Sequence, residues 1–139
     1  HQGGDVTLAD APGVDDFQGF GAGQTHGGDL ALDLAGMRPE AERAYQWLAD
    51  IQRHDGSWHQ YYLADGIEQD KLDANTIAYI AAGVWHHWLV ARDPGFVETM
   101  WPVVEKAVEF VLDLQTPRGE ILWARHADGT PWALTPPAR

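Results

Sequence analysis

Apolar side chains return every three or four positions in three stretches of the chain, the spacing that gathers them on one face of an α-helix. The clearest stretch covers residues 74–92 and follows Asp73, a residue type that caps helix N-termini. Two others predict helices over residues 39–52 and 96–115, the second of them after Asp93. The sequence therefore predicts an all-α fold of helices joined by turns. The apolar positions are Ala41, Ala44, Tyr45, Leu48 and Ile51, then Ile77, Ile80, Ala81, Val84, Trp85, Trp88 and Leu89, and finally Val104, Ala107, Val108, Val111 and Leu112.

Three local patterns refine this expectation. Residues 59–72 carry tyrosines and acids without a helical period, which predicts a connecting loop. Pro102 falls inside the third helix, where a proline removes one backbone hydrogen bond, so we expect a kink or a restart there. The second helix has small, uncharged residues such as Ala78 and Ala82 on its other face, and we expect it to be more buried than its neighbours.

The N-terminal part of the chain has a different composition. Residues 1–30 are rich in glycine and aspartate, contain no lysine or arginine and follow neither a helical nor a strand period. We interpret them as an irregular or disordered head, followed by one helical domain over residues 31–139.

The end of the first helix and the end of the third share an internal repeat with a constant offset of 63 residues. Each copy contains a basic residue, an alanine, an aromatic residue, an aliphatic residue, a glutamine and a glycine in the same order. The glutamines are Gln52 and Gln115, and the glycines are Gly56 and Gly119. A glutamine can join a turn to a neighbouring helix through its amide, and a glycine permits the left-handed backbone that reverses the chain. Repeats of this kind indicate stacked supersecondary units.

The first copy closes with Trp58, and the pattern resembles the QW motif of the terpenoid cyclase and protein prenyltransferase superfamily. In the second copy Ile121 stands at the motif position and Trp123 comes two residues later. The resemblance implies helical hairpins that form part of an α/α toroid, in which these residues brace outer helices and take no part in catalysis. A two-residue shift keeps a ring on the same face of an extended segment, so we expect Trp123 to take the place of the tryptophan.

The second half also resembles the hairpins of six-hairpin glycosidases, on Asp93-Pro94-Gly95-Phe96 followed by Trp101-Pro102-Val103-Val104. The run from Gly56 to Tyr61 suits a loop that contacts a sugar. Three helices are too few for a complete ring, so we expect a fragment or truncated relative that self-associates through open hydrophobic edges.

The acidic loop before the second helix holds the catalytic candidates Glu68, Asp70 and Asp73. In a toroid this loop faces the central cavity, where carboxylates act as a general acid or as the acid/base pair of a glycosidase. The alternative is a helix cap at Asp73 preceded by solvated acids.

Aromatic residues are the candidates for substrate contact. Tyr61, Tyr62, Trp85 and Trp88 suit a cavity for an isoprenoid, whose carbocations an aromatic face attracts, or for a carbohydrate, which stacks on such a face. Ordinary core packing is the alternative for each.

The sequence lacks the residues or motifs of several kinds of site. The chain has no cysteine, no Asp-x-Asp-Asp acid and no Asp-Asp-x-x-Asp magnesium motif, and no residue pattern identifies a cofactor. The neighbours His86 and His87 point about 100° apart on a helix, so we expect no metal site there.

The net charge of −12 argues against nucleic acid as a partner. No apolar run is long enough for a membrane span, and we expect a cytoplasmic protein. The leading hypothesis from sequence is a prenyltransferase-like or terpenoid-cyclase-like protein of isoprenoid metabolism, truncated and inactive if the ring is incomplete. The alternatives are a glycoside hydrolase or other carbohydrate-active six-hairpin protein, and a non-catalytic binding or scaffold remnant.

Overall fold

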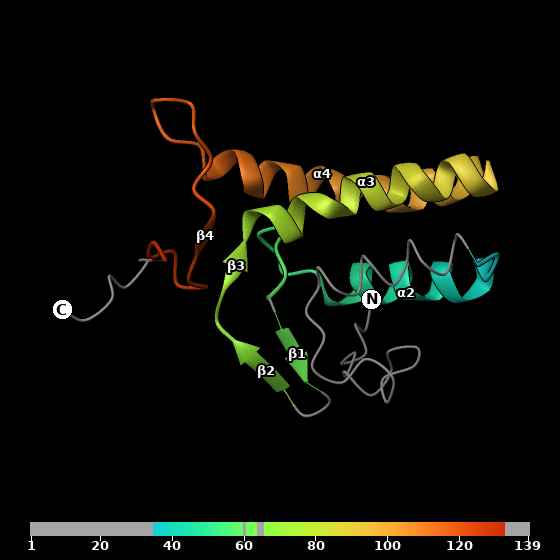
Figure 1. The fold of residues 1–139 in the computed structure, drawn as a ribbon, viewed down its shortest axis with the longest axis horizontal. Helices are drawn as coiled ribbons and strands as arrows, with labels where there is room; N and C mark the ends of the chain where they lie inside the picture. The colour runs from blue at the N-terminus through green and yellow to red at the C-terminus, as the bar shows by residue number, and fades with distance from the viewer. Residues whose placement is uncertain (1–34, 60, 64–65, 133–139) are drawn as a thin grey trace.

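The computed structural model describes residues 35–59, 61–63 and 66–132, with the side chains of residues 61–69 left aside. The predicted head, residues 1–30, lies outside this part of the chain. Within it the elements follow the order α2, β1, β2, β3, α3, α4 and β4 (Figure 1). The helices are α2 (Arg38–Ile51), α3 (Ala74–Ala91) and α4 (Pro94–Asp113), and the strands are β1 (Tyr61–Leu63), β2 (Gly66–Gln69), β3 (Leu72–Asp73) and β4 (Ala124–Arg125).

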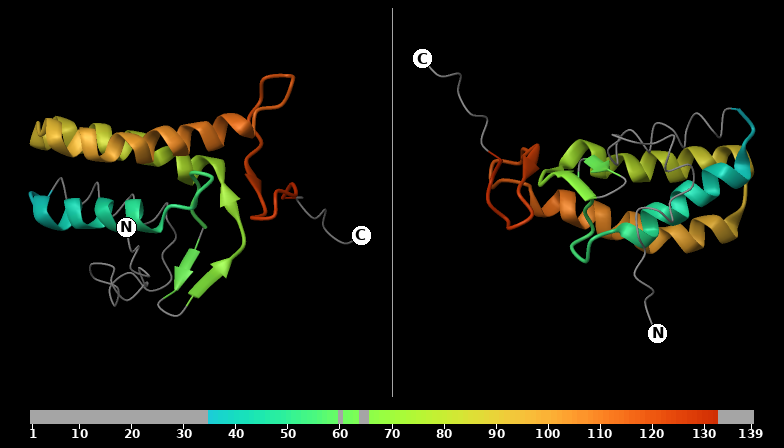
Figure 2. Two further views of the ribbon diagram at one scale, coloured as in Figure 1. Left: turned by 180° about the vertical axis from the view of Figure 1, so that it is seen from behind. Right: turned by 90° about the horizontal axis from the view of Figure 1, so that it is seen from below.

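Helices α3 and α4 form a hairpin whose connection is two residues long. Arg92 adopts a left-handed backbone with φ 51°, and its amide donates to the carbonyl of Trp88, which ends α3. Asp93 then caps α4 by accepting a hydrogen bond from the amide of Gly95 at 3.0 Å. The two helices lie side by side in one layer, and α2 covers one face of that layer (Figures 1 and 2). The helical-hairpin fold predicted from the sequence is confirmed.

The hydrophobic core lies between α2 and the α3–α4 hairpin. Tyr45 is fully buried there, with its ring 5.3 Å from that of Phe96 in an edge-on contact. Gly83 allows this approach, because a Cβ at its position would lie 2.7 Å from the Tyr45 hydroxyl. Burial of these side chains away from water supplies most of the stabilisation of the hairpin. Other core residues are Leu48, Trp58, Leu72, Ile77, Ile80, Met100, Ala107 and Phe110.

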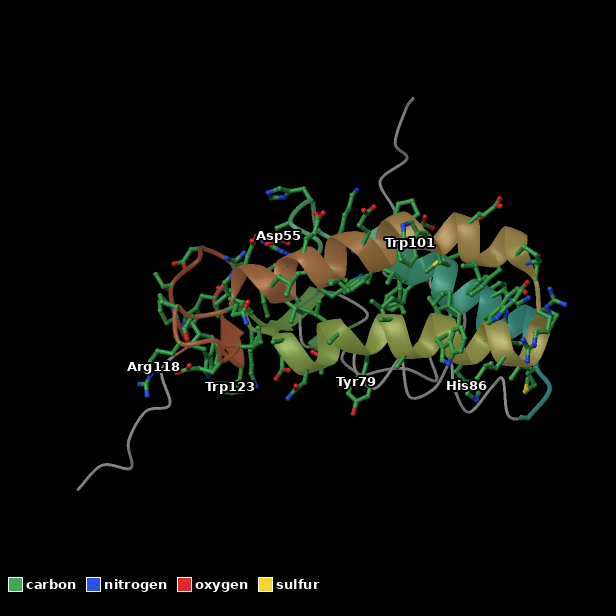
Figure 3. All side chains as sticks on the ribbon, turned by 90° about the horizontal axis from the view of Figure 1, so that it is seen from above. Asp55, Tyr79, His86, Trp101, Arg118 and Trp123 are labelled. Atoms are coloured by element: carbon green, nitrogen blue, oxygen red, sulfur yellow. The ribbon has the colours of Figure 1, made fainter. Side chains whose placement is uncertain are left out.

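The opposite face of α3 corrects one expectation. Among the described residues, Ala78, Tyr79, Ala82 and Trp85 are exposed, so the second face of α3 is not buried. Its inner stripe faces α2, while Tyr79 on the outer stripe points away from α4 (Figure 3). The low charge of that outer stripe therefore marks an open apolar surface and not a second buried face.

Helix α4 continues through Pro102, so the predicted restart is wrong. Pro102 is exposed, while Met100, Val103 and Val104 on either side of it are buried in the core. An interior proline costs about 3 kcal/mol. Packing of the flanking residues offsets that cost and keeps the helix in one piece.

The predicted loop over residues 59–72 is wrong in part, because this segment forms strands. β1 and β2 pair antiparallel, with Tyr62 opposite Ile67, and β3 pairs antiparallel with β4, with Leu72 opposite Arg125. Tyrosine favours strands, and the dipeptide Asp65-Gly66 between the two segments is a hairpin signal in the sequence. The β3–β4 pair joins the segment before α3 to the segment after α4.

None of the helices within the described residues is both long and apolar enough to cross a membrane.

Candidate active site

The first glutamine–glycine turn connects the end of α2 to the middle of α4. The side-chain amide of Gln52 donates to the carbonyl of Gly56 at 3.0 Å and to the carbonyl of Val103 at 2.9 Å. Gly56 has φ +91°, and a Cβ at its position would lie 2.1 Å from the carbonyl oxygen of Lys106. The turn therefore presses its backbone directly onto α4, which a larger residue would prevent.

Trp58 covers this junction. Its ring is fully buried, and its Nε1 donates to the carbonyl of Leu48 in the last turn of α2 at 2.8 Å. This bond satisfies a carbonyl at a helix end, where intrahelical partners run out. The bracing role that the sequence suggested for Gln52, Gly56 and Trp58 agrees with these contacts.

The second turn repeats the backbone geometry of the first. The amide of residue 53 donates to the carbonyl of residue 57 at 2.9 Å, and the amide of residue 116 donates to that of residue 120 at 2.8 Å. Gln115 donates to the carbonyl of Gly119 at 2.9 Å, as Gln52 does to Gly56. Trp123 does not take the place of Trp58, however. It is partly exposed, and the Lys71 amine lies over its ring at 4.1 Å.

Asp70 lies at the end of the molecule where β3 and β4 pair. Its carboxylate accepts a hydrogen bond from the amide of Ala127 at 3.1 Å and has one histidine on each side. Nδ1 of His59 is 3.9 Å from Asp70 Oδ1, and Nδ1 of His126 is 3.7 Å from Asp70 Oδ2. The Asp70 side chain is exposed, so a ligand can reach this carboxylate.

The protonation state of His59 follows from its surroundings. Burial is the main cause that lowers its pKa, and the positive charge of Arg53 lowers it further, while Asp70 and Asp55 act in the opposite direction. Nη1 of Arg53 lies 2.9 Å from His59 Nε2, and a guanidinium can only donate. Nε2 therefore accepts, and the proton of the neutral ring sits on Nδ1, which faces Asp70.

A second ionic group, centred on Asp55, shares Arg53 with the group around His59. Asp55 accepts hydrogen bonds from the hydroxyl and amide of Ser57, and its Oδ2 lies 3.2 Å from Nη2 of Arg125. Burial raises the pKa of Asp55, but the hydrogen bonds from Ser57 and Arg125 and the charge of Arg53 outweigh it, so the pKa is lowered on balance. Arg125 thereby links the first turn to β4.

Aromatic rings border Asp70 on the β4 side. The Lys71 amine lies over the ring of Trp123 and 5.8 Å from the ring centre of Trp132, and the His126 ring is 4.5 Å from that of Trp132. Figure 3 shows Trp123 at this end of the molecule, beyond the start of α3. An exposed carboxylate, two imidazoles, an ammonium group and two indoles thus lie together, and we call these six residues the polar end: His59, Asp70, Lys71, Trp123, His126 and Trp132.

The predicted catalytic acids have different positions. Asp73 caps α3, with Oδ1 accepting from the amides of Asn75 at 2.9 Å and Thr76 at 3.2 Å, and Lys71 lies 3.7 Å from its Oδ2. Asp73 therefore forms the helix cap that was the alternative to a catalytic role. Asp70 belongs to the polar end. Glu68 lies on β2, and its side chain is outside the described part, so its role stays a prediction.

Two of the four predicted aromatic candidates, Trp85 and Trp88, lie on the helical hairpin and not on the segment that holds the acids. Trp85 and Trp88 line a groove of about 510 Å³ between α3 and α4, with Trp101 and Val97 among its other walls. Glu98 is the charged residue among its described walls, so the groove offers few hydrogen bonds to a sugar. The side chains of Tyr61 and Tyr62, on β1, are outside the described part.

The two neighbouring histidines of α3 have separate environments. His87 is fully buried between the rings of Tyr45 and Phe96, with Nε2 3.1 Å from Glu42, whereas His86 is partly exposed. Arg38 and His87 both contact Glu42; the Arg38 bond is the main cause of its lowered pKa. His87 is therefore part of the packing between α2 and α3.

Sequence reasoning missed most of the polar end. The sequence does not indicate that His59, Asp70 and Lys71 lie near Trp123, His126 and Trp132, because the two groups are far apart along the chain. Only the pairing of β3 with β4 brings them together, and two-residue strands leave no periodic signal in a sequence.

Comparison with known proteins gives two relatives, both named as glycosyl hydrolases. The chain is 48% identical over 100 residues to the MMP endo-(1,4)-3-O-methyl-α-D-mannosidase of Mycolicibacterium hassiacum, a match that covers 72% of this chain and 28% of the relative. It is 34% identical over 85 residues to an uncharacterised glycosyl hydrolase of Methanocaldococcus jannaschii, covering 59% of this chain and 14% of the relative. No family model matches the chain. These relatives favour the six-hairpin glycosidase resemblance and give no support to the terpenoid cyclase and prenyltransferase one.

Proposed function

We propose that this chain forms part of a glycoside hydrolase that acts on an α-linked, mannose-containing oligosaccharide. The observation that carries the proposal is the 48% identity to a protein named as an endo-(1,4)-3-O-methyl-α-D-mannosidase. The chain spans little more than a quarter of that relative, and the hydrolase activity of the whole protein is part of what we propose. The isoprenoid hypothesis has no comparable support.

The polar end is the part of the described structure that best suits a carbohydrate. Sugars present hydroxyl groups to hydrogen-bonding side chains and apolar ring faces to aromatic ones, and Asp70, Lys71 and Trp123 offer both within one surface. The groove beside Trp85 offers aromatic faces but few polar partners. We therefore assign carbohydrate contact to the polar end.

Asp70 is the residue that we expect to act on the substrate. Glycosidases use two carboxyl groups, one of which gives a proton to the leaving oxygen or takes one from water. Asp70 is exposed, and neutral His59 points its Nδ1 proton toward it. The second carboxyl group is Glu68 or a residue outside this chain. Asp73, whose Oδ1 is engaged at the start of α3, serves mainly as the cap.

Titration of the chain with a (1→4)-linked 3-O-methyl-α-D-mannose oligosaccharide tests the proposal. We expect saturable quenching of tryptophan fluorescence that weakens at least tenfold in Asp70→Asn and Trp123→Ala. Glu105→Gln, an exposed acid on α4, is the matched control and leaves the affinity unchanged. An unquenched wild-type signal, or equal affinities for Asp70→Asn and Glu105→Gln, contradicts the proposal.

A further inference from the structure

The two copies of the repeat differ in what covers them. In the first copy, Tyr45 and Trp58 are fully buried; 63 residues later, Val108 is 39% exposed and Ile121 is 38% exposed. The Gly56 position meets the Lys106 carbonyl, whereas no described residue lies within 4 Å of a Cβ at Gly119. The second copy therefore repeats the apolar positions and the backbone of the first, but no described residue covers it.

The hydrogen bonds show the same difference. Gln52 donates to its own turn and also to the carbonyl of Val103 on α4. Among the described residues, the Gln115 amide donates to its own turn, at Gly119, and its side chain is exposed. A further carbonyl, placed against Gln115 as the Val103 carbonyl of α4 is placed against Gln52, would give Gln115 the same two hydrogen bonds.

We infer that the second copy, through Val108, Gln115, Gly119 and Ile121, is a docking surface for a helix of a further helical hairpin. The helix lies on this turn as α4 lies on the first, with one main-chain carbonyl accepting from Gln115 and another resting against Gly119. Figure 1 shows the segment after α4 projecting on the side of the hairpin away from α2, and Figure 3 shows Arg118 of this turn at the outer end of the molecule.

A second copy of this chain does not fit the site as well as a further hairpin does. The helix that fits the first turn is α4, and its Val103 and Lys106 carbonyls already contact Gln52 and Gly56 of the same chain. A further hairpin offers equivalent carbonyls that are still open. Because the chain spans 28% of its mannosidase relative, a protein of that length has room for such hairpins.

The test extends the full chain with a second copy of residues 73–113, joined after residue 139 by a flexible Gly/Ser linker that raises the local concentration of the hairpin. We expect the amides of Gly119 and Leu122 to exchange with solvent at least tenfold more slowly in the extended protein. In the unextended chain, Gly119→Ala and Gly129→Ala should lower the melting temperature by similar amounts, since both glycines have positive φ and open surroundings. In the extended protein Gly119→Ala should lower it at least twice as much as Gly129→Ala.

Unchanged amide exchange in the extended protein overturns the inference, even if the Gly119→Ala form fails to fold. Equal effects of Gly119→Ala and Gly129→Ala in the extended protein also overturn it. If the unextended chain sediments as a dimer that Gly119→Ala dissociates, the occupant is a second copy, and the assignment to a further hairpin is wrong. None of these results bears on oligosaccharide binding at Asp70, which is measured separately.

Discussion

The close contact between Gly56 and α4 makes Gly56→Ala the sharpest test of how the fold is held together. The new methyl group would lie 2.1 Å from the Lys106 carbonyl oxygen and 2.5 Å from its carbon, distances that real contacts do not reach. The obstacle is helix backbone and not a flexible side chain, so the turn must move away from α4. That movement breaks the bond from Gln52 to Val103 and loosens the packing of Trp58.

Gly129→Ala provides the matched control. Gly129 has φ +92° against +91° for Gly56, and the turns share one hydrogen-bond pattern, but no described residue lies within 4 Å of a Cβ at Gly129. Both substitutions carry the cost of a left-handed alanine, about 1–2 kcal/mol. Gly56→Ala adds about 1 kcal/mol for the lost hydrogen bond and about 1–3 kcal/mol for overpacking. We therefore expect it to be about 2–4 kcal/mol more destabilising than Gly129→Ala.

Urea unfolding, followed by tryptophan fluorescence and by far-ultraviolet circular dichroism, measures this difference. If the unfolding curves of the two variants have equal slopes and different midpoints, the substitution has changed the stability and not the size of the unit that unfolds. For a protein of this size, the difference corresponds to roughly 7–14 °C in melting temperature. If Gly56→Ala and Gly129→Ala agree within about 0.5 kcal/mol, the turn does not rest on α4, and the account of the repeat given above is refuted.

Three further predictions concern a buried ring, a helix cap and acid stability. Trp58→Phe should cost about 2–3 kcal/mol in urea unfolding, because it leaves the Leu48 carbonyl without its partner and opens a small cavity; a loss below 0.5 kcal/mol would contradict this. Asp73→Ala should cost about 1 kcal/mol while Asp73→Asn, which keeps an acceptor, should cost less; equal losses would argue against the cap. The pKa of His59 is lowered in the folded protein, so the unfolded chain takes up a proton first, and stability should fall as the pH drops below about 6.5. The lowered pKa of Asp55 should give a second fall in stability below about pH 3.8. In urea unfolding at a series of pH values, His59→Gln should remove the first fall in the midpoint and leave the second. A pH profile unchanged by His59→Gln would refute the assignment.

The helices could be predicted from the sequence because their signals are local. The apolar stripe of α3, the cap at Asp73 and the turn at Gly56 each depend on residues a few positions apart. The continuity of α4 through Pro102 could not be predicted in this way, since it depends on packing of the neighbouring residues against other elements.

The candidate site depended even more on distant contacts. Asp70 was singled out from its acidic loop, but its neighbours His59 and His126 are 67 residues apart in the chain. The sequence predicts Trp85 as a substrate contact from its residue type, and only the structure shows that it lines the groove between α3 and α4. Helical periodicity reports which face of a helix is apolar, but it does not report whether that face meets a core, a ligand or another hairpin.

The pairing of β3 with β4 has an evolutionary consequence. Leu72 and Arg125 are opposite each other, so the stretch from β3 through the α3–α4 hairpin to β4 begins and ends at neighbouring points in space. A segment with adjacent ends can be duplicated or transferred between genes while the chain on either side keeps its path. The stretch from Leu72 to Arg125 has 54 residues, nine fewer than the 63-residue offset of the repeat, as expected if the two copies arose by duplication of one helical hairpin.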